Sequence, residues 1–517
     1  MNIHLQREGL KVIQAKDVGS DRVTLSADVV VVGSGAGGAV TAYELARAGL
    51  RVIILEAGPY VPSSEFREDF DHAMSTLYAD RGTQTNADGD LLVLQGSCVG
   101  GSTVVNGCVA FRTPDHILAD WQRDHGLTDL TPARLAPYFA KVEKRLSVHR
   151  NQAWEINRNS QVLGQGCDKL GISWQPLQRN IKDCAMTGFC LSGCASDRKQ
   201  SMLVTYLPWA LAEGAQLHAD TRVTRVLARD GSVSGVEAEV RDPLSGKVVA
   251  RLTVTAERVI LAAGAVQTPL LLQRSRLANG SGQVGRNFAC HPSTLVVGDY
   301  PERIDSWQGA LLGISIDEWA HPDKGGFLLE GGGAGPVELA GVADPGTGRA
   351  FMDYMRRVGH LAGLVTLIHD RNVGDISEKD GLKTINYRLD DADFKAMLAA
   401  IKAAARVHFA AGATRVWLPT VEQLHGDNDA EVEAALAGLK NQPHTFRMVS
   451  YHPQGTCRMG ADRKRSVVGP RGETHEVKGL YVADASLLPT SIIVNPQITV
   501  YALASYIADG ILSDINT

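Results

Sequence analysis

Residues 27–59 read ADVVVVGSGAGGAVTAYELARAGLRVIILEAGP and decide the fold of the chain. The four β-branched residues Val29–Val32 predict a strand that is buried on both faces. Glycines follow at the G-x-G-x-x-G spacing, before a stretch with helical periodicity. A second apolar strand, Val52–Leu55, completes a βαβ unit. Together these features predict a dinucleotide-binding turn between strand and helix.

The glycine turn lets backbone N–H groups approach a pyrophosphate, and the following helix N-terminus adds a favourable dipole. Glu56 ends the second strand, where its carboxylate can accept hydrogen bonds from a ribose. The fingerprint alone permits NAD as well as FAD. The residues of this unit expected at the dinucleotide are Gly33, Ser34, Gly35, Ala36, Gly37, Gly38, Glu56 and Ala57.

Length and composition restrict the class of protein. A chain of 517 residues is long for one domain, and 44% hydrophobic residues are typical of a large core. A net charge of -5 gives no electrostatic case for nucleic acid or an anionic membrane. The sequence shows no signal-peptide pattern and no run of about 18 apolar residues, so we expect no transmembrane helix. Eight cysteines without a secretion signal suggest reduced thiols and a cytoplasmic location.

A second glycine-rich segment spans residues 95–121, QGSCVGGSTVVNGCVAFRTPDHILADW. Its glycines let the backbone approach a flat ligand, and its polar side chains can form hydrogen bonds. Alone, the pattern is also that of an ordinary turn cluster; after a dinucleotide fingerprint it favours a flavin-facing loop. The residues expected at the cofactor here are Gly100, Gly101, Ser102, Asn106, Gly107 and Val109.

Three cysteines, Cys184, Cys190 and Cys194, lie within eleven residues. They could belong to an iron–sulfur ligand set, or to a zinc site if a fourth ligand came from elsewhere. The alternative is a compact turn with buried thiols. Since Cys167 is distant and no other cysteine is near, the turn is the favoured reading and we predict no metal.

Alternating residues over 217–263 predict a β-meander followed by a buried strand, Val259–Ala262. Val223 is a candidate for packing against an adenine, and Ala263 brings backbone close to the cofactor. Residues 290–450 read as a second, substrate-facing domain with a helix over Asp391–Ala411. An apolar pocket wall is suggested by Leu311, Leu312, Phe327, Leu328 and Leu329.

The last 70 residues return to the cofactor. The loop YHPQGTCRMG, Tyr451–Gly460, carries His452, and a strand over Leu480–Ala483 ends at Asp484. Asn495 is the predicted N-cap of the next helix, with proline at its first position. That helix start would favour negative charge on a nearby flavin. The residues expected at the site here are Asp484, Ala485, Asn495, Pro496 and Gln497.

Four motifs in order, VVVGSGAGGAVTAYELARAGLRVIILEAG, GGSTVVNG, HPQGTCRMG and GLYVADASLLPTSIIVNPQIT, resemble the glucose–methanol–choline (GMC) family of flavin oxidoreductases. The resemblance implies FAD as cofactor, His452 as catalytic base and Asn495 as its partner. It also places the adenine-packing valine at Val223. Val105 stands where some relatives carry the histidine that binds FAD covalently, so we expect non-covalent FAD. The cysteine segment is similar to that of the long-chain alcohol oxidase and cholesterol oxidase-like branches.

The fold implied is α/β, α+β overall. A Rossmann-like FAD-binding domain accompanies a substrate domain built on an antiparallel sheet with helices. We expect the FAD-binding domain in residues 1–150, 206–295 and 446–517, and the substrate domain in residues 296–445, with an excursion over 151–205.

The activity implied is oxidation of an alcohol, an apolar primary or aryl one, to an aldehyde or ketone by hydride transfer to flavin. The alternative within the family is a sugar, polyol or sterol dehydrogenase that passes electrons to a quinone or cytochrome rather than to oxygen. From other classes, a flavin protein without turnover and a nicotinamide-dependent reductase remain open. The expected partners are a small-molecule alcohol and an electron acceptor; an oligomer is permitted.

Overall fold

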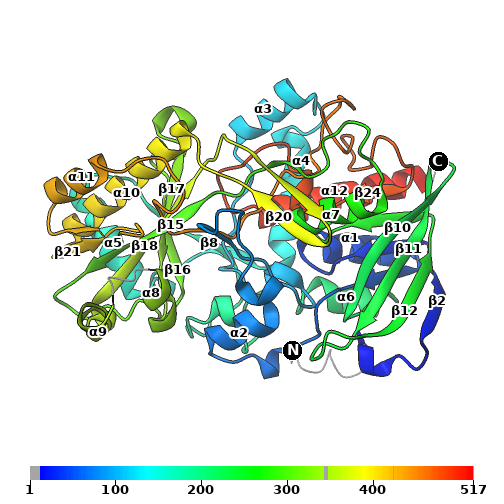
Figure 1. Cartoon of the computed structure of the whole chain (residues 1–517), viewed down its shortest axis with the longest axis horizontal. Coiled ribbons are helices and arrows are strands. Elements are labelled where there is room, and N and C mark those ends of the chain that lie inside the picture. The colour runs from blue at the N-terminus through cyan, green and yellow to red at the C-terminus, as the bar shows by residue number, and fades with distance from the viewer. Residues whose placement is uncertain (1–11, 343–346, 423, 516–517) are drawn as a thin grey trace.

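The structure is a computed structural model, and it describes residues 12–342, 347–422 and 424–515. Two lobes lie side by side (Figure 1). One contains α1 (Ala36–Arg47), α12 (Gln497–Ile515) and strands β10–β12 (residues 221–255), and the other contains α10 (Asp391–Ala411), β15 (Ser293–Asp299) and β18 (Leu361–Ile368). Before the βαβ unit, the described residues form β1 (Val12–Ile13) and β2 (Arg22–Ser26).

A parallel six-stranded sheet forms the centre of the first lobe. In spatial order its strands are β1 (Val12–Ile13), β9 (Gln216–His218), β4 (Val52–Leu55), β3 (Val29–Val32), β13 (Arg258–Leu261) and β24 (Leu480–Val482). The four valines of β3 are at most 5% exposed, because strands lie on both sides and helices cover the faces. The Rossmann-like prediction is therefore confirmed.

Close packing against this sheet explains two glycines of the fingerprint. Helix α1 (Ala36–Arg47) starts directly after β3 and lies against α12 (Gln497–Ile515). A Cβ atom on Gly37 would lie 1.5 Å from the carbonyl oxygen of Ala483, and one on Gly38 would lie 2.0 Å from that of Gly33. Only glycine permits the helix to approach the strands this closely.

The predicted β-meander is present as a second sheet of this lobe. Strands β10 (Thr221–Arg229), β11 (Ser232–Arg241) and β12 (Val248–Thr255) are antiparallel, and β2 (Arg22–Ser26) adds to β12 in parallel. Helix α7 (Gly264–Ser275) contacts β10 and follows β13.

The second lobe contains a nine-stranded, mostly antiparallel sheet. Its strands are β22 (His425–Gly426), β21 (Arg415–Trp417), β15 (Ser293–Asp299), β18 (Leu361–Ile368), β17 (Phe327–Gly332), β16 (Leu312–Ile316), β7 (Gln175–Pro176), β23 (Met448–Ser450) and β5 (Leu91–Val93). Helix α10 has the predicted bounds, Asp391–Ala411, and packs with α5 (Arg158–Leu170). A second hydrophobic core forms here and includes Leu91 and Val93 of β5. The domain boundaries given above stay a prediction.

Residues 60–92 contain a helix that the sequence analysis did not identify. They contain α2 (Phe70–Leu77), whose N-terminus is capped by Asp69 accepting the N–H of His72 at 3.0 Å. The sequence analysis did not identify this helix, because its eight residues mix polar and apolar side chains without a clear periodicity. The remaining elements are α3 (Asp115–His125), α4 (Pro132–Arg145), α6 (Tyr206–Ala212), α8 (Pro336–Val342), α9 (Arg349–Arg356), α11 (Asp429–Ala437), β6 (Val148–Arg150), β8 (Gln178–Asn180), β14 (Arg286–Phe288), β19 (Gly374–Lys379) and β20 (Leu382–Asn386).

Helix α12 is long and apolar enough to cross a membrane; no other helix within the described residues meets both criteria. Of its most apolar window, 67% is buried inside the protein, as in the core helix of a folded domain.

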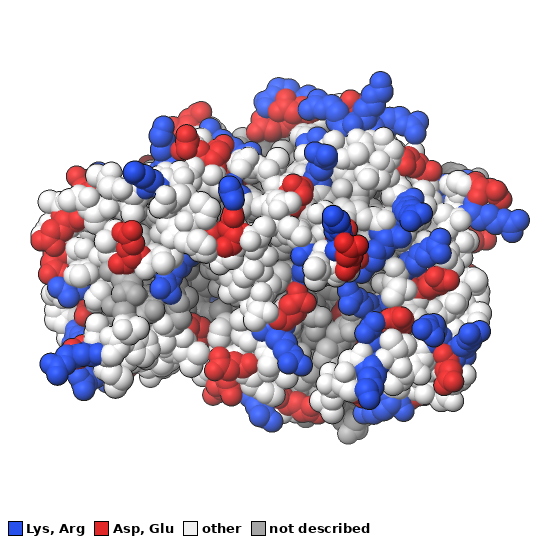
Figure 2. Space-filling model, in the orientation of Figure 1, with Lys and Arg blue, Asp and Glu red and all other residues white. Residues whose placement is uncertain are grey.

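On the face shown in Figure 2, basic and acidic side chains lie interspersed.

Candidate active site

A cavity of about 1320 Å³ lies where the carboxyl ends of the parallel strands face the second lobe. It exceeds the roughly 300–1,000 Å³ of most small-molecule pockets, so it has room for a dinucleotide and a substrate. Most predicted site residues line it: Gly33, Gly35, Ala36, Gly37, Glu56, Ala57, Gly101, Ser102, Asn106, Gly107, Val109, Val223, Ala263, His452, Asp484, Ala485, Asn495, Pro496 and Gln497. Ser34, Gly38 and Gly100 are buried and do not line it.

The start of α1 fits a pyrophosphate. Gly33 and Gly35 open onto the cavity directly before the helix, whose first turn, Ala36–Ala39, is uncharged. A Cβ atom on Gly35 would have Gly101 Cα, 3.8 Å away, as its nearest neighbour, so the protein leaves this space open. Exposed N–H groups at a helix N-terminus bind anions of this kind.

Glu56 lines the cavity but also holds the turn together. One carboxylate oxygen accepts the N–H and hydroxyl of Ser34 at 2.9 and 2.7 Å, and the other accepts the N–H of Gly58 at 2.9 Å. Burial raises the pKa of Glu56 against the effect of these donors. A carboxylate can accept about four hydrogen bonds, so capacity for a ribose hydroxyl remains. The ribose role of Glu56 stays a prediction.

The second glycine segment lies against the start of α12. Asn106 donates its amide N–H to Gln497 Oε1 at 2.8 Å, and Gln497 donates to the carbonyl of Val109 at 2.5 Å. Ser34 Oγ accepts the N–H of Gly100 at 3.0 Å, which joins this loop to the fingerprint turn. The glycine turn, the glycine loop and the α12 start, distant in sequence, thus form one wall.

Asp484 and Val223 line other parts of the cavity. Asp484 accepts the N–H of Gly264 at 2.8 Å and that of Ser486 at 2.8 Å, so it joins β24 to α7. Val223, in β10, is 6% exposed. Their contacts with cofactor stay predictions.

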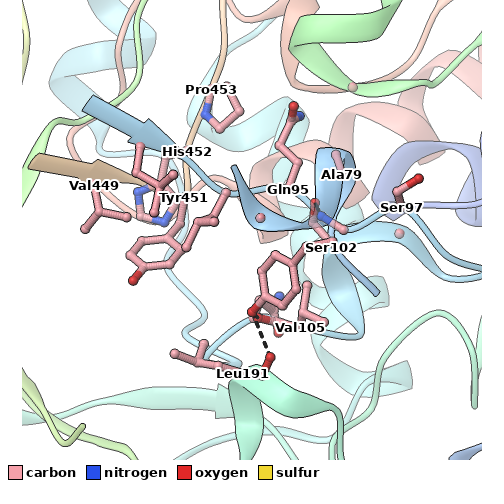
Figure 3. A pocket seen from close by; sticks show the side chains of 18 of the residues that line it. Ala79, Gln95, Ser97, Ser102, Val105, Leu191, Val449, Tyr451, His452 and Pro453 are labelled. Carbon is pink, nitrogen blue, oxygen red and sulfur yellow. Dashed lines mark hydrogen bonds between the residues drawn. The ribbon is translucent and has the colours of Figure 1, made fainter. Parts of the chain in front are cut away.

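His452 and Asn495 meet at the cavity. Asn495 Nδ2 and His452 Nε2 are 3.3 Å apart. His452 lies beside Tyr451 and Val449 on one wall, across from Ser102 and Gln95 (Figure 3). Removal of the ring from solvent lowers the pKa of His452 to about 4, so this imidazole is neutral near pH 7.

The sequence did not point to His291, which contacts His452 from behind. Its Nε2 accepts the N–H groups of Ile492 and Ile493 at 3.2 and 2.9 Å, and Gln454 Nε2 lies 3.1 Å away. Neutral His291 must therefore carry its proton on Nδ1, which lies 3.2 Å from His452 Nδ1. It follows that neutral His452 accepts at Nδ1 and carries its own proton on Nε2, toward Asn495.

The Asn495 side chain corrects one prediction. Its Oδ1 is buried and has no hydrogen-bond partner among the described residues, so it caps no helix. Helix α12 begins at Gln497, and Pro496 accepts its first backbone bond from Val500. The predicted N-cap at Asn495 is wrong, because the side chain is turned toward His452. If the amide were turned by 180°, its oxygen would face the Nε2 proton of His452.

Glu330 is a second site residue that the sequence analysis missed. This β17 carboxyl lines the cavity, is 3% exposed, and its Oε1 has no partner in the described part of the chain. Burial raises its pKa to about 7, against a hydrogen bond from Asn495 that lowers it. A charged residue within the apolar strand FLLEGG is the signal that could have identified it.

Two of the five residues predicted to form an apolar wall line the cavity. Leu311 and Leu312 line the cavity, as do Val365 and Leu295 from the neighbouring strands. Phe327, Leu328 and Leu329 do not, since these β17 residues are packed inside the protein. Further apolar lining comes from Phe70, Met74, Tyr78, Leu191 and Trp307.

The cysteine segment holds no metal-ligand cluster in the described residues, where no three His, Cys, Asp or Glu side chains are grouped for a metal ion. All eight cysteines are free thiols. Gly188 and Gly193 have φ of 81° and 90° in this segment.

Fold and cavity together define a dinucleotide-binding protein with a buried polar cluster at its cofactor site. An FAD binding domain matches residues 28–66, which contain the fingerprint turn. GMC oxidoreductase models match residues 74–293 and 372–504.

An uncharacterised GMC-type oxidoreductase of Mycobacterium tuberculosis is 33% identical over 95% of this chain and 76% of its own length. The chain therefore belongs to the GMC oxidoreductase family and is an FAD-dependent oxidoreductase. The long-chain-alcohol oxidase FAO4B of Arabidopsis thaliana is 29% identical, covering 97% of this chain and 69% of the relative.

Two solved oxidases share the fold. Pyridoxine 4-oxidase from Mesorbium loti superimposes with a TM-score of 0.72 at 19% identity, over 94% of this chain and 99% of that one. Formate oxidase from Aspergillus oryzae superimposes with a TM-score of 0.71 at 19% identity, over 96% and 99%. At this identity they support the fold alone.

Proposed function

We propose that this protein oxidises an apolar primary or aryl alcohol to an aldehyde or ketone. The observation that carries the proposal is the His452–Asn495 pair, 3.3 Å apart, on the wall of a cavity that also contains the dinucleotide cradle. FAD, bound without a covalent link, would supply the acceptor for a hydride from the alcohol carbon.

His452 and Asn495 would bind the hydroxyl oxygen, and His452 would take or share its proton as the alkoxide forms. A base must be neutral before it accepts a proton, and the low pKa of His452 satisfies this condition near pH 7. Asn495 would hold the oxygen through its amide.

The first test measures flavin reduction anaerobically with a panel of alcohols graded by chain length and ring type. The expected result is bleaching by apolar primary or aryl alcohols. His452→Ala should slow bleaching by about 10²–10⁴-fold, the usual contribution of a positioned base, while FAD absorbance is retained. Equal rates in variant and wild type would contradict the role of His452; bleaching by sugars alone would favour the sugar dehydrogenase alternative.

Glu330 is a second candidate for the proton acceptor. In the free protein His452 carries its proton on Nε2, so it can take the hydroxyl proton there only after changing tautomer. Glu330 has an unpaired oxygen on the same cavity wall and a pKa of about 7, near that expected of a general base.

The pH dependence of flavin reduction separates the two acceptors. Each acceptor loses activity when it becomes protonated as the pH falls. If His452 accepts the proton, the rate falls only near pH 4, and Glu330→Gln stays within about tenfold of wild type. If Glu330 accepts it, the rate falls near pH 7 and Glu330→Gln costs about 10²–10⁴-fold. A wild-type rate that is flat from pH 8 to 5 would eliminate Glu330.

The substrate proposal is supported by the apolar lining contributed by Phe70, Met74, Leu311 and Leu312, and by the likeness to long-chain-alcohol oxidases. A sugar, polyol or sterol, with a quinone or cytochrome as acceptor, is the competing proposal. Peroxide formed when air is readmitted would identify oxygen as the acceptor. A cytoplasmic location and the absence of nucleic-acid partners stay predictions.

A further inference from the structure

The ammonium group of Lys199 is buried against the glycine-rich segment that lines the cofactor cavity. The residue is 2% exposed, and its Nζ donates to the carbonyl oxygens of Val104, Asn106 and Cys190 at 2.6, 3.0 and 2.7 Å. Three carbonyl acceptors require three N–H donors, which only the protonated amine provides. Lys199 therefore carries a positive charge inside the protein.

This buried charge has no acidic partner. Within residues 12–342, 347–422 and 424–515, Lys199 forms hydrogen bonds to carbonyl groups but no ion pair. Arg179, a buried cation in the adjoining strand β8, has by contrast the carboxylate of Glu155 at 3.5 Å. Since an uncompensated charge in the interior costs free energy, the Lys199 ammonium favours an anion in the neighbouring cavity.

Lys199 also fixes the direction of one peptide group on the cavity wall. The carbonyl and the N–H of a trans peptide point in opposite directions, so the hydrogen bond from Lys199 to the Asn106 carbonyl turns the N–H of Gly107 away from Lys199. Gly107 lines the cavity, and no atom of the described residues accepts this N–H. An acceptor on the bound cofactor can supply the missing partner.

The position of Lys199 along the segment indicates which part of the cofactor it faces. The segment lies beside Gly35 of the pyrophosphate turn at Gly101, and its Asn106 binds Gln497, two residues after Asn495. Lys199 binds residues 104 and 106, at the second of these two ends. That end lies next to the His452–Asn495 pair, where the proposed function places the flavin ring, and the inference rests on this placement.

We propose that Lys199 is the fixed positive charge that stabilises the reduced, anionic form of the bound FAD. A hydride carries two electrons and one proton, so reduction by hydride transfer adds one negative charge to the cofactor. A cation that is already in place favours this charged product, and the low dielectric constant of the interior strengthens the attraction. Lys199 does not line the cavity, so it acts on the cofactor through its charge and sets the reduction potential.

The reduction potential of the FAD-loaded enzyme tests the proposal without any alcohol, so a wrong substrate assignment cannot affect the result. The potential is measured against a dye of known potential while xanthine and xanthine oxidase supply electrons. Lys199→Met removes the charge and keeps an unbranched side chain. It should weaken the binding of reduced relative to oxidised FAD by at least about tenfold, which lowers the potential of a two-electron couple by about 30 mV. A potential equal to that of wild type would overturn the proposal.

Two further variants separate the charge of Lys199 from its hydrogen bonds and from the total charge. Lys199→Gln is neutral but can still donate two N–H groups, and its potential should fall as that of Lys199→Met does. A wild-type potential in Lys199→Gln would show that only the hydrogen bonds matter. Lys383→Met also removes one positive charge, but from a side chain that is 21% exposed and paired with Asp80, so its potential should equal that of wild type. A shift as large as in Lys199→Met would contradict a specific role for Lys199.

A measurement on the wild-type enzyme decides the matter if the Lys199 variants do not bind FAD. The absorbance spectrum of the reduced cofactor distinguishes its anionic form from its neutral form. The anionic form should persist when the pH of the reduced enzyme is lowered from 8 to 5. Conversion to the neutral form within this range would show that no fixed cation stabilises the anion.

Discussion

The position of the proton on His291 determines which nitrogen of neutral His452 carries a proton, and it affects the pKa of His452. Three N–H groups surround Nε2 of His291, which leaves its Nδ1 proton facing His452. Protonated His452 would place an N–H against this N–H, so the contact opposes protonation of His452. Ile493, one of the donors, has φ of 61°, a strained conformation for a β-branched residue, which ties the arrangement to the loop before α12.

His291→Gln should move the acid limb of the pH–rate profile to higher pH. Glutamine can still accept the N–H groups of Ile492 and Ile493 through its oxygen, but it removes the N–H that faces His452. The pKa of His452 should therefore rise from about 4 by about one unit or more, and flavin reduction should fail at correspondingly higher pH.

His291→Asn is the matched control for that experiment. Its shorter amide can keep a donor toward His452 but cannot reach the N–H groups of Ile492 and Ile493. We expect lower stability and an unmoved acid limb. If the two variants share one pH profile, His291 has only a structural role.

At this scale the sequence predicted part of the site. His452 and Asn495 lie in motifs and could be identified from them. His291 and Glu330 could not be placed in the same way, since their roles depend on which distant segments they face. The prediction that Asn495 is an N-cap was wrong for the same reason. Local sequence rules favoured a cap, but the amide of Asn495 faces His452, which is distant in the sequence.

At the scale of single elements, two glycines in the turn from β3 into α1 have different roles. Gly37 permits close packing of the helix on the sheet, whereas Gly35 leaves space for the cofactor. Gly37→Ala places a methyl group 1.5 Å from a backbone carbonyl and should lower the free energy of unfolding by about 1–3 kcal/mol or more. Gly35→Ala meets no protein atom closer than 3.8 Å, but its methyl group enters the cavity.

We therefore expect Gly35→Ala to fold with near-wild-type stability as apoprotein and to bind FAD weakly. Urea unfolding of both apoproteins and FAD titration by fluorescence measure the two effects. Wild-type FAD affinity in Gly35→Ala would place the pyrophosphate elsewhere; wild-type stability in Gly37→Ala would contradict the close packing of α1 on the sheet.

Elements with strong periodicity were predicted with their observed bounds. Strands Val29–Val32 and Val52–Leu55 and helix Asp391–Ala411 depend on local apolar patterns and caps. Helix α2 was missed because its sequence, FDHAMSTL, mixes polar and apolar residues over only two turns. The pairing of β5 with β23 was not predictable, since more than 350 residues separate the partners Leu91 and Met448.

Considered as a whole, the molecule gathers its cofactor cavity from residues between Val32 and Val500, drawn from both lobes. A ligand bound there contacts segments of both lobes at once. FAD at 100 times its dissociation constant should raise the free energy of unfolding by about 2.7 kcal/mol if it binds only the folded chain.

Thermal unfolding of the apoprotein and of the FAD-loaded protein, followed by fluorescence and circular dichroism, measures this stabilisation. We expect both signals to shift upward together, because the cavity joins the two lobes. Two separate transitions, of which FAD shifts only one, would indicate that one lobe unfolds independently of the cofactor.

The order of strands in the central sheet also has a consequence for synthesis on the ribosome. Strand β3 emerges early, but its neighbour β13 begins at Arg258, and β24, the edge strand beside β13, begins at Leu480. At roughly 5–20 residues per second, the interval between β3 and β24 is roughly 20–90 s. During that time the apolar edge of the nascent sheet lacks its final partner. Chaperone binding to the growing chain should therefore persist until α12 is made, and FAD can be captured only after residues 480–500, which complete the sheet and the cavity, have been made.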